Sequence, residues 1–329
     1  MRVSAAELRR VTETSLVGAG YPADEIPQIV EVLTYAQWRG NWQSLIQLSS
    51  AGLPRFQATG SIHIERETAV SALLHGELHP GIVVMCRTME VAETKVKASG
   101  VAIVGAHHSA PPGTGAVGFY AEKLAAVGFV AFGWSGSSEL VAPYGGAEPR
   151  FGTNPISVGF PTANQPLVID VATSAIPAFE LARHRLFGQA LPHATALDDQ
   201  GHDTDDPEIA KALKTFGDSP KSSALALMVE VLTGPFVRAS FAGVGDTRSN
   251  WGNLIVAIDP EIFVVRDQLE AEVDELLQSV RTTRPRPGFG AVTLPGESAR
   301  ARARQVEVSG YVEIDDELWK RVRDKVRPS

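Results

Sequence analysis

The first fifty residues carry apolar side chains at helical spacing. Leu8, Val11 and Leu16 fall on one side of a helix that would follow Ser4, and Gly18 ends the pattern. A second helix is predicted after Asp24, with an apolar face made by Ile26, Ile29, Val30 and Leu33. The chain therefore begins with two amphipathic helices.

The middle of the chain switches between strand and helix patterns. Short β-type runs alternate with polar residues from Ser61 to Val84, and a helix is predicted over Glu90–Ser99. The β-branched run 101–108 follows, then a helix over 119–128 and a further apolar run over 129–137. A series of strand, helix and strand favours an α/β core.

The rest of the chain adds a long loop, one more apolar run and three helices. The predicted segments are a Gly- and Pro-rich loop with a short strand (141–161), an apolar run that ends on polar residues (167–174), helices near Ile176–Leu186 and Lys221–Leu232, a long surface connection (281–295) and a charged terminal helix (315–326).

Composition and charge narrow the class of protein. The 329 residues are 44% hydrophobic and 21% charged, as in a soluble globular protein. The formal net charge is −8 without clustered Lys and Arg, so nucleic acid is not an expected partner. No run approaches the roughly 20 apolar residues of a membrane span, and no apolar signal segment opens the chain. Cys86, the one cysteine, lies in an apolar run and excludes an intrachain disulfide. We expect a cytoplasmic protein with no membrane partner.

Two segments could carry chemistry near the middle of the sequence. Glycines in the loop Gly145–Pro155 would let a ligand approach the backbone, although such loops are also common as plain structure. The loop is not the GxGxxG fingerprint of dinucleotide-binding folds. Asp170 ends a buried strand, where ligands of open α/β sheets bind, but it could equally cap the next helix.

Basic residues offer two further candidates. Lys221 opens a predicted helix and could hold a phosphate or carboxylate there, or be an ordinary solvated lysine. The adjacent pair His107-His108 follows a buried strand, where catalytic groups collect. A zinc site would need a third ligand, and no metal-type spacing is found near the pair. The remaining histidines are expected at the surface: His63, His75, His79, His184, His193 and His202.

These motifs, taken in order, resemble the type-2 malate/L-lactate dehydrogenase family, which includes ureidoglycolate and sulfolactate dehydrogenases, 2,3-diketogulonate reductase and Δ1-piperideine-2-carboxylate reductase. The resemblance rests on VAPYGG, FGTNPISVGFP, PLVIDVATSA and PKSSALALMVEVLTG, and extends from the first helix to about residue 315. It implies an α/β, non-Rossmann NAD(P)-binding fold in which a central mixed sheet is flanked by a helical part from both termini. The implied division is a terminal domain, 1–75 and 280–329, and a cofactor domain, 76–279.

The resemblance also implies an activity and a site. Family members are typically homodimers that transfer hydride between NADH or NADPH and a carbon next to a carboxylate. The implied cofactor-binding residues are Gly152, Thr153, Asn154, Pro155, Asp170, Val171, Ala172, Thr173, Lys221 and Ser222. The segment Lys221-Ser222-Ser223 stands where the family has Lys-Gly-Tyr. Asp170 would also act electrostatically or orient a proton donor.

This chain departs from the family pattern at the proton donor. The family's catalytic histidine follows an Arg-Gly like Arg39-Gly40, but no histidine occurs here before His63. The arginine that grips the substrate carboxylate is missing too. His108 is the first candidate replacement, with His107 second. Ser44 falls near the family histidine's position, where an unactivated hydroxyl would rather position a substrate or water, and Lys221 is a further candidate.

The absence of the family's proton-donating histidine affects which class of substrate we expect. A protonated imine accepts hydride without a proton from the protein, whereas a ketone develops alkoxide charge and needs a donor. We therefore expect an NAD(P)H-dependent reductase with a remodelled pocket, acting on a C=N or C=O substrate. The alternative is a catalytically silent relative that binds a nucleotide or a partner protein.

Overall fold

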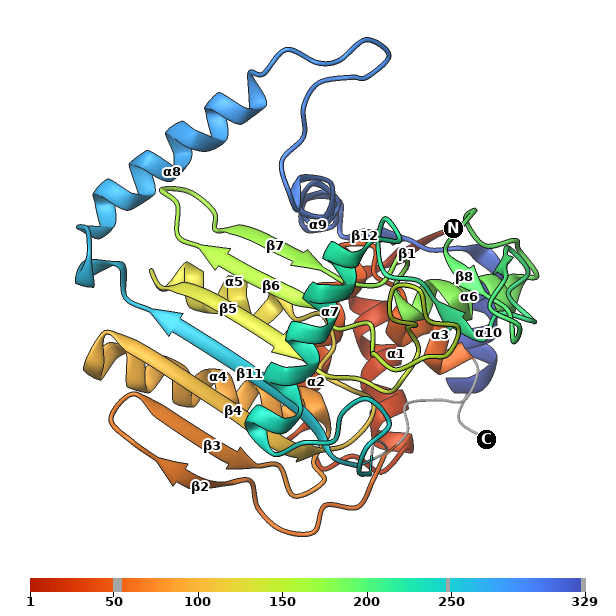
Figure 1. Ribbon diagram of the computed structural model, residues 1–329, viewed down its shortest axis with the longest axis horizontal. Coiled ribbons are helices and arrows are strands. Elements are labelled where there is room, and N and C mark those ends of the chain that lie inside the picture. Colours follow the sequence, from red (N-terminus) through yellow and green to blue (C-terminus); the bar gives the residue numbers. More distant parts are fainter. Residues whose placement is uncertain (50–54, 247–248, 327–329) are drawn as a thin grey trace.

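A seven-stranded mixed sheet lies at the centre of the protein (Figure 1). The computed structural model describes residues 1–49, 55–246 and 249–326. In spatial order, the strands of the sheet are β2 (His63–Glu67), β3 (Ser71–His75), β4 (Val101–Ser109), β11 (Trp251–Ile258), β5 (Val130–Ser135), β6 (Ile156–Phe160) and β7 (Leu167–Val171). Only β3 and β4 pair in parallel, and the other neighbours are antiparallel. The predicted α/β fold with a mixed sheet is confirmed.

Helices cover both faces of this sheet. Helices α4 (Gly81–Ser99) and α5 (Gly118–Ala126) pack on one face, and α7 (Pro220–Thr233) crosses the other (Figure 1). Helix α5 approaches β6 closely, since a Cβ atom at Gly159 would lie 2.4 Å from the Ala121 carbonyl oxygen. A glycine on β6 is therefore needed at this contact.

The start of α4 differs from the sequence prediction. Residues 81–84 were placed in a β-type stretch and the helix was expected from Glu90, but the helix already begins at Gly81. Every residue from Gly81 to Cys86 is buried, because this half of α4 is surrounded by the sheet and by neighbouring helices. A helix buried all round loses the polar face that a helical pattern requires, and its apolar run then resembles a strand.

Both ends of the chain build the helical part beside the sheet. Strand β1 (Arg2–Ser4) pairs antiparallel with β12 (Tyr311–Glu313), which brings the two ends together. The helices of this part are α1 (Ala5–Gly18), α2 (Ile26–Trp38), α3 (Gln43–Ser49), α9 (Glu297–Ser309) and α10 (Asp316–Val326). Ser4 caps α1 by accepting a hydrogen bond from the Glu7 N–H at 3.0 Å. The flanking part from both termini is confirmed.

One hydrophobic cluster joins the helical part to the sheet. It includes Leu8 of α1, Val104 of β4 and Trp319 of α10, all fully buried. Strands β2 and β3 lie within the range 1–75 that was assigned to the terminal domain, yet they form one edge of the central sheet. The two-domain division stays a prediction.

The remaining elements lie outside this core. They are α6 (Ala178–Phe187), β8 (Ala196–Leu197), β9 (Asp203–Thr204), β10 (Ala212–Leu213), η1 (Pro235–Val237), η2 (Pro260–Ile262) and α8 (Arg266–Arg281). Helix α8 buries no residue and stands away from the body of the molecule in Figure 1. It is followed by the exposed connection that the sequence predicted over 281–295.

Burial confirms some single-residue predictions and overturns others. Cys86 is buried, and this burial raises the pKa of its thiol to about 12. The expectation of surface positions is wrong for His75, His79 and His184, which are half-buried or buried because each packs against neighbouring side chains or backbone. Within the described ranges, no helix combines the length and apolar character needed to cross a membrane.

Candidate active site

Three pockets that share lining residues lie where β6 begins and β7 ends. Asp170 and Asn41 line two of them, and Thr153 and Pro155 also line two. The walls come from the α2–α3 connection, the residues before α5, the loop before β6 and the start of α6. Two sequence segments that were singled out separately, the loop 145–155 and the strand end at Asp170, therefore meet at one place.

The loop before β6 is fixed to α7 by a buried carboxylate. Glu230 accepts hydrogen bonds from the Gly152 N–H and from Asn154 Nδ2, both at 3.0 Å. Asn154 Nδ2 also donates to the Ala226 carbonyl oxygen at 3.0 Å. A Cβ at Gly152 would lie 2.8 Å from the Ser137 carbonyl oxygen, a backbone atom, so this turn requires glycine. The loop is thus rigid before any ligand arrives.

Asn154 faces away from the pockets. Its side chain is fully buried beneath the loop, and its φ of 42° lies in the left-handed region that asparagine tolerates better than most residues. The sequence predicted that Asn154 contacts the cofactor, whereas the structure gives its side chain a bracing position. The pocket is lined instead by the neighbouring Thr153 and Pro155.

Thr173 has a similar bracing position after β7. It is fully buried, and its Oγ1 donates to the Asn154 carbonyl oxygen at 3.0 Å. Its backbone N–H donates to the Thr153 carbonyl oxygen at 2.9 Å. Ala172 lines a pocket and Val171 is exposed. The two predicted motifs, GTNP and DVATS, therefore hold each other in place.

Asp170 presents its carboxyl group to the pockets. The N–H of Gly118, the first residue of α5, donates to Asp170 Oδ2 at 2.9 Å. A Cβ at Gly118 would lie 2.9 Å from that oxygen, so the close approach needs glycine. Surrounding protein atoms raise the pKa of Asp170 to about 6, and the Gly118 N–H opposes this shift. Asp170 also remains in contact with pocket water.

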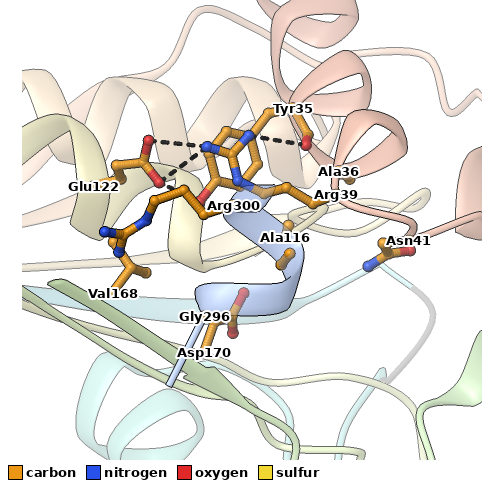
Figure 2. A pocket seen from close by; sticks show the side chains of 11 residues that line it. Tyr35, Ala36, Arg39, Asn41, Ala116, Glu122, Val168, Asp170, Gly296 and Arg300 are labelled. Atoms are coloured by element: carbon orange, nitrogen blue, oxygen red, sulfur yellow. Dashed lines mark hydrogen bonds and ion pairs between the residues drawn. The ribbon is translucent and has the colours of Figure 1, made fainter. Parts of the chain in front are cut away.

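A polar wall faces Asp170 across the pocket (Figure 2). Glu122 accepts hydrogen bonds from Tyr35 Oη at 2.8 Å and from Arg39 Nη2 at 3.0 Å. The Arg39 guanidinium also lies 3.5 Å from the centre of the Tyr35 ring, so Arg39 is already engaged. Arg300 of α9 lines the same pocket and donates to the Pro166 carbonyl oxygen at 2.8 Å.

Arg300 is a residue that the sequence analysis missed. It lies in the helical part, far in sequence from the motifs, and no local pattern distinguishes it from the other arginines of α9. Only the packing of α9 beside β7 brings its guanidinium into the pocket with Asp170. Five N–H donors make guanidinium suited to binding a carboxylate.

At the start of α7, where an anion site was predicted, the serine hydroxyl groups already form hydrogen bonds within the protein. Ser222 is fully buried, and its hydroxyl bonds to Thr215 Oγ1 at 3.0 Å and forms a capping box with Ser219. Ser223 Oγ accepts a hydrogen bond from the Tyr144 N–H at 3.1 Å, and Lys221 is exposed. None of the three serines or Lys221 lines the pockets that contain Thr153 and Asp170.

Two predicted catalytic residues, Ser44 and His108, lie elsewhere too. Ser44 of α3 is buried and accepts a hydrogen bond from Gln37 Nε2 at 2.7 Å. His108 is the second-last residue of β4, and burial lowers the pKa of its ring, as it does for His107. Neither Ser44 nor His108 lines the three pockets, and β11, β5 and β6 separate β4 from the strand of Asp170.

Comparison with known proteins identifies the family. A family profile described as malate/L-lactate dehydrogenase matches residues 3–323. The chain belongs to this family. One curated relative is L-sulfolactate dehydrogenase of Methanothermobacter thermautotrophicus, 31% identical over 342 aligned positions that cover 98% of this chain and 95% of the relative. A Δ1-pyrroline-2-carboxylate reductase of Burkholderia ambifaria is 43% identical over 161 positions, covering 46% of each chain.

A solved structure gives the same result for the fold. Δ1-Piperideine-2-carboxylate reductase of Pseudomonas syringae pathovar tomato superimposes with a TM-score of 0.82 at 25% identity, covering 99% of each chain. The malate/L-lactate dehydrogenase family comprises NAD(P)-dependent dehydrogenases and reductases, so the predicted enzyme class and cofactor class are confirmed.

Proposed function

We propose that the protein uses NADH or NADPH to reduce a C=N or C=O carbon that carries a carboxylate. The observation that carries this proposal is the pairing of Arg300 and Asp170 in one pocket. The guanidinium would bind the substrate carboxylate, and Asp170 would face the atom that becomes protonated. The relatives named above are a sulfolactate dehydrogenase and two cyclic imine carboxylate reductases, which supports a small carboxylate substrate.

The cofactor would lie beside the loop before β6. This pocket is lined by Thr153 and Pro155, by the glycines before α5 and by the hydroxyl-rich segment 135–138. Glycines and small hydroxyl side chains leave backbone N–H groups accessible, and these groups suit ribose and phosphate oxygens. A bound nicotinamide cofactor supplies the hydride. The protein would hold the substrate at Arg300 and supply the proton.

Asp170 is the proposed proton donor for a carbonyl substrate. It lines the pocket and its pKa is raised to about 6, so a useful fraction is protonated near neutral pH. With an imine substrate the nitrogen already carries its proton, and an ionised Asp170 would stabilise the cation. Asp170 therefore replaces His108, which the sequence analysis gave as the first candidate for the proton donor.

We also propose that the protein is a homodimer located in the cytoplasm. The outer side of α7 exposes Leu225, Leu227, Met228 and Val231. Helix α8 buries none of its own residues. A second copy of the chain covering the outer side of α7 would remove this apolar surface from water.

Steady-state kinetics test the proposed function. We expect NADH or NADPH oxidation with Δ1-pyrroline-2-carboxylate, Δ1-piperideine-2-carboxylate or a 2-oxo acid. Arg300→Met should raise KM about 10- to 100-fold, the value of hydrogen bonds to a charged group, with little change in the cofactor Kd. Arg304→Met is the matched control, because Arg304 lies one turn later on α9, is exposed and does not line the Asp170 pocket.

Two results would count against this function. An unchanged KM in Arg300→Met would remove the carboxylate-binding role. Cofactor binding in a fluorescence titration, without turnover of any imine or oxo acid, would favour the catalytically silent alternative instead.

A further inference from the structure

A row of histidines crosses one edge of the central sheet. In the strand register, His63 of β2 lies opposite His75 of β3, and His75 lies opposite His107 of β4. Residues directly opposite each other on neighbouring strands project from the same face of a sheet. The His63 and His75 rings stack at 5.4 Å between centroids, and those of His75 and His107 meet edge-on at 4.9 Å.

His108 joins this row through its backbone conformation. The residue after His107 on a regular strand would project to the opposite face. His108 has a φ of 53°, and its ring instead stacks on His75 with 4.4 Å between centroids. Its Nδ1 lies 2.5 Å from His107 Nδ1. Three imidazoles therefore converge from two strands.

The ligand atoms of this cluster are close enough to share one ion. One ring nitrogen each of His75, His107 and His108 lie within 4.8 Å of one another. Nitrogens that bind one tetrahedral zinc at about 2.0–2.1 Å are separated by about 3.3 Å. Rotation of the half-buried His75 and His108 rings about their side-chain torsions can bring the nitrogens to this spacing, which requires His108 Nδ1 to move away from His107 Nδ1. His107 is held in a fully buried position.

A carboxylate orients His107 for metal binding. Glu65 Oε2 lies 3.1 Å from His107 Nε2, and Arg238 Nη1 donates to the same oxygen at 2.8 Å. When Nε2 donates its proton to Glu65, Nδ1 keeps a free electron pair that faces His108. An arrangement in which a carboxylate binds a histidine and the histidine binds the metal recurs at zinc sites.

Charges around the cluster favour a cation. Glu77 Oε1 lies 3.1 Å from His75 Nδ1, and the Glu77 N–H also points at this nitrogen at 3.2 Å. Glu65 and Glu77 together carry two negative charges, and Arg238 balances one of them. The excess negative charge would attract a divalent ion.

We propose that His75, His107 and His108 bind one divalent transition-metal ion, with zinc as the best match. Three neutral imidazoles leave a fourth position for water or a carboxylate. The sequence analysis found no third ligand for His107-His108, because His75 is distant in sequence and reaches the pair only through the pairing of β3 with β4. The proposed site is separate from the pocket of Asp170 and does not depend on the proposed reaction.

Calorimetric titration with Zn²⁺ tests this site in protein without a histidine tag. We expect one ion per chain and intense visible absorption bands when Co²⁺ is used as a probe of tetrahedral coordination. Glu65→Gln should weaken zinc binding about 10- to 100-fold through the orientation of His107. His75→Asn should weaken it further, and its partial exposure makes a folded variant attainable, which circular dichroism would verify.

Control variants decide the assignment. His193→Asn, at an exposed histidine outside the cluster, should bind zinc like the wild type. Equal affinity in His75→Asn and the wild type, or no binding at all, would overturn the proposal. Loss of binding in His63→Asn with retention in His107→Asn would place the ion on His63, His75 and Glu77 and would overturn it too.

Discussion

The carboxyl group of Asp170 connects a helix terminus to the pocket that we propose for the substrate. It accepts the first helical N–H of α5 at Gly118 and lies across the pocket from Arg300. Protein atoms around it disfavour the ionised form, while the α5 N-terminus favours this form. The balance raises its pKa from 3.8 to about 6, which places its titration where a proton donor is useful.

This position predicts a pH profile that depends on the substrate. Reduction of a 2-oxo acid should fall as pH rises above about 6, because only protonated Asp170 donates. Asp170→Asn should lower the rate of 2-oxo acid reduction by about 10²–10⁴-fold and remove its decrease above pH about 6. The rate of imine reduction should change less. The exposed Asp205→Asn serves as control. An unchanged pH dependence in Asp170→Asn would identify another donor.

The raised pKa of Asp170 also determines how its contribution to the free energy of unfolding changes with pH. A folded-state pKa above the unfolded value means that the folded protein holds the proton more tightly. The contribution of Asp170 to the free energy of unfolding is therefore fully present below pH 3.8 and is lost as pH rises through about 6. In Asp170→Asn, the free energy of unfolding from urea denaturation should depend less on pH between 3.8 and about 6 than in the wild type.

Among elements, the contact between α5 and β6 sets the position of Gly118 and hence of Asp170. Gly159 lies opposite Ala131 on β5 and beneath α5, where the Ala121 carbonyl oxygen leaves no room for a side chain. Any side chain at this position would push α5 away from the sheet. The glycine thus connects packing in the sheet to geometry in the pocket.

Gly159→Ala should therefore destabilise the protein. The added methyl group forces a shift of α5 or β6, at a cost of about 1–3 kcal/mol in the free energy of unfolding. Gly18→Ala is the opposite case, because Gly18 is helical, has no neighbour within 4 Å of an added Cβ, and should gain a few tenths to about 1 kcal/mol. Urea denaturation of both variants measures the difference, and equal midpoints would contradict the packing argument.

The sequence predicted elements better than it predicted side-chain directions. Helices α1, α5 and α7 and strands β4 and β5 were expected close to their observed ranges, because each has a clear period or bounding glycines. The motifs GTNP and DVATS were placed together through the family resemblance. Local patterns do not say which side of a loop faces solvent, so Asn154 was expected in the pocket and is buried beneath it.

Long-range pairing explains the remaining differences. Arg300 enters the pocket only because α9 packs beside β7, and His75 meets His107 only through strand register. Neither relation leaves a signal in a local sequence window. Helix α8 was not predicted, although Leu269, Val273 and Val280 recur at helical spacing, and none of its residues is buried among those that the structure describes.

At the scale of the whole molecule, the outer side of α7 presents apolar side chains that the described residues leave exposed. Leu227 and Val231 of α7 are about half exposed, at 54% and 49%, and lie one turn apart on the side of α7 away from the sheet. Apolar side chains that cluster on one helix face indicate an interaction surface more strongly than scattered ones do. A homodimer would cover this face by placing two such helices against each other or against α8.

Sedimentation velocity tests the dimer. Wild-type protein should sediment as a dimer at micromolar concentration, and Leu227→Asp combined with Val231→Asp should shift it to monomer, because burying unpaired carboxylates opposes association. Val308→Asp is the control, since Val308 of α9 is 83% exposed and lies outside the apolar face of α7. A monomeric wild type would contradict the proposed assembly.

The position of β11 has a consequence for synthesis on the ribosome. Strands β4 and β5 are not hydrogen-bonded to each other, and β11, more than a hundred residues after β5, lies between them. At about 5–20 residues per second, the two halves of the sheet would wait roughly 6–25 s for the strand that joins them. During this interval both halves present unpaired edges. The nascent chain is therefore most vulnerable to aggregation before Trp251 emerges, and a truncated product that ends earlier cannot complete its sheet.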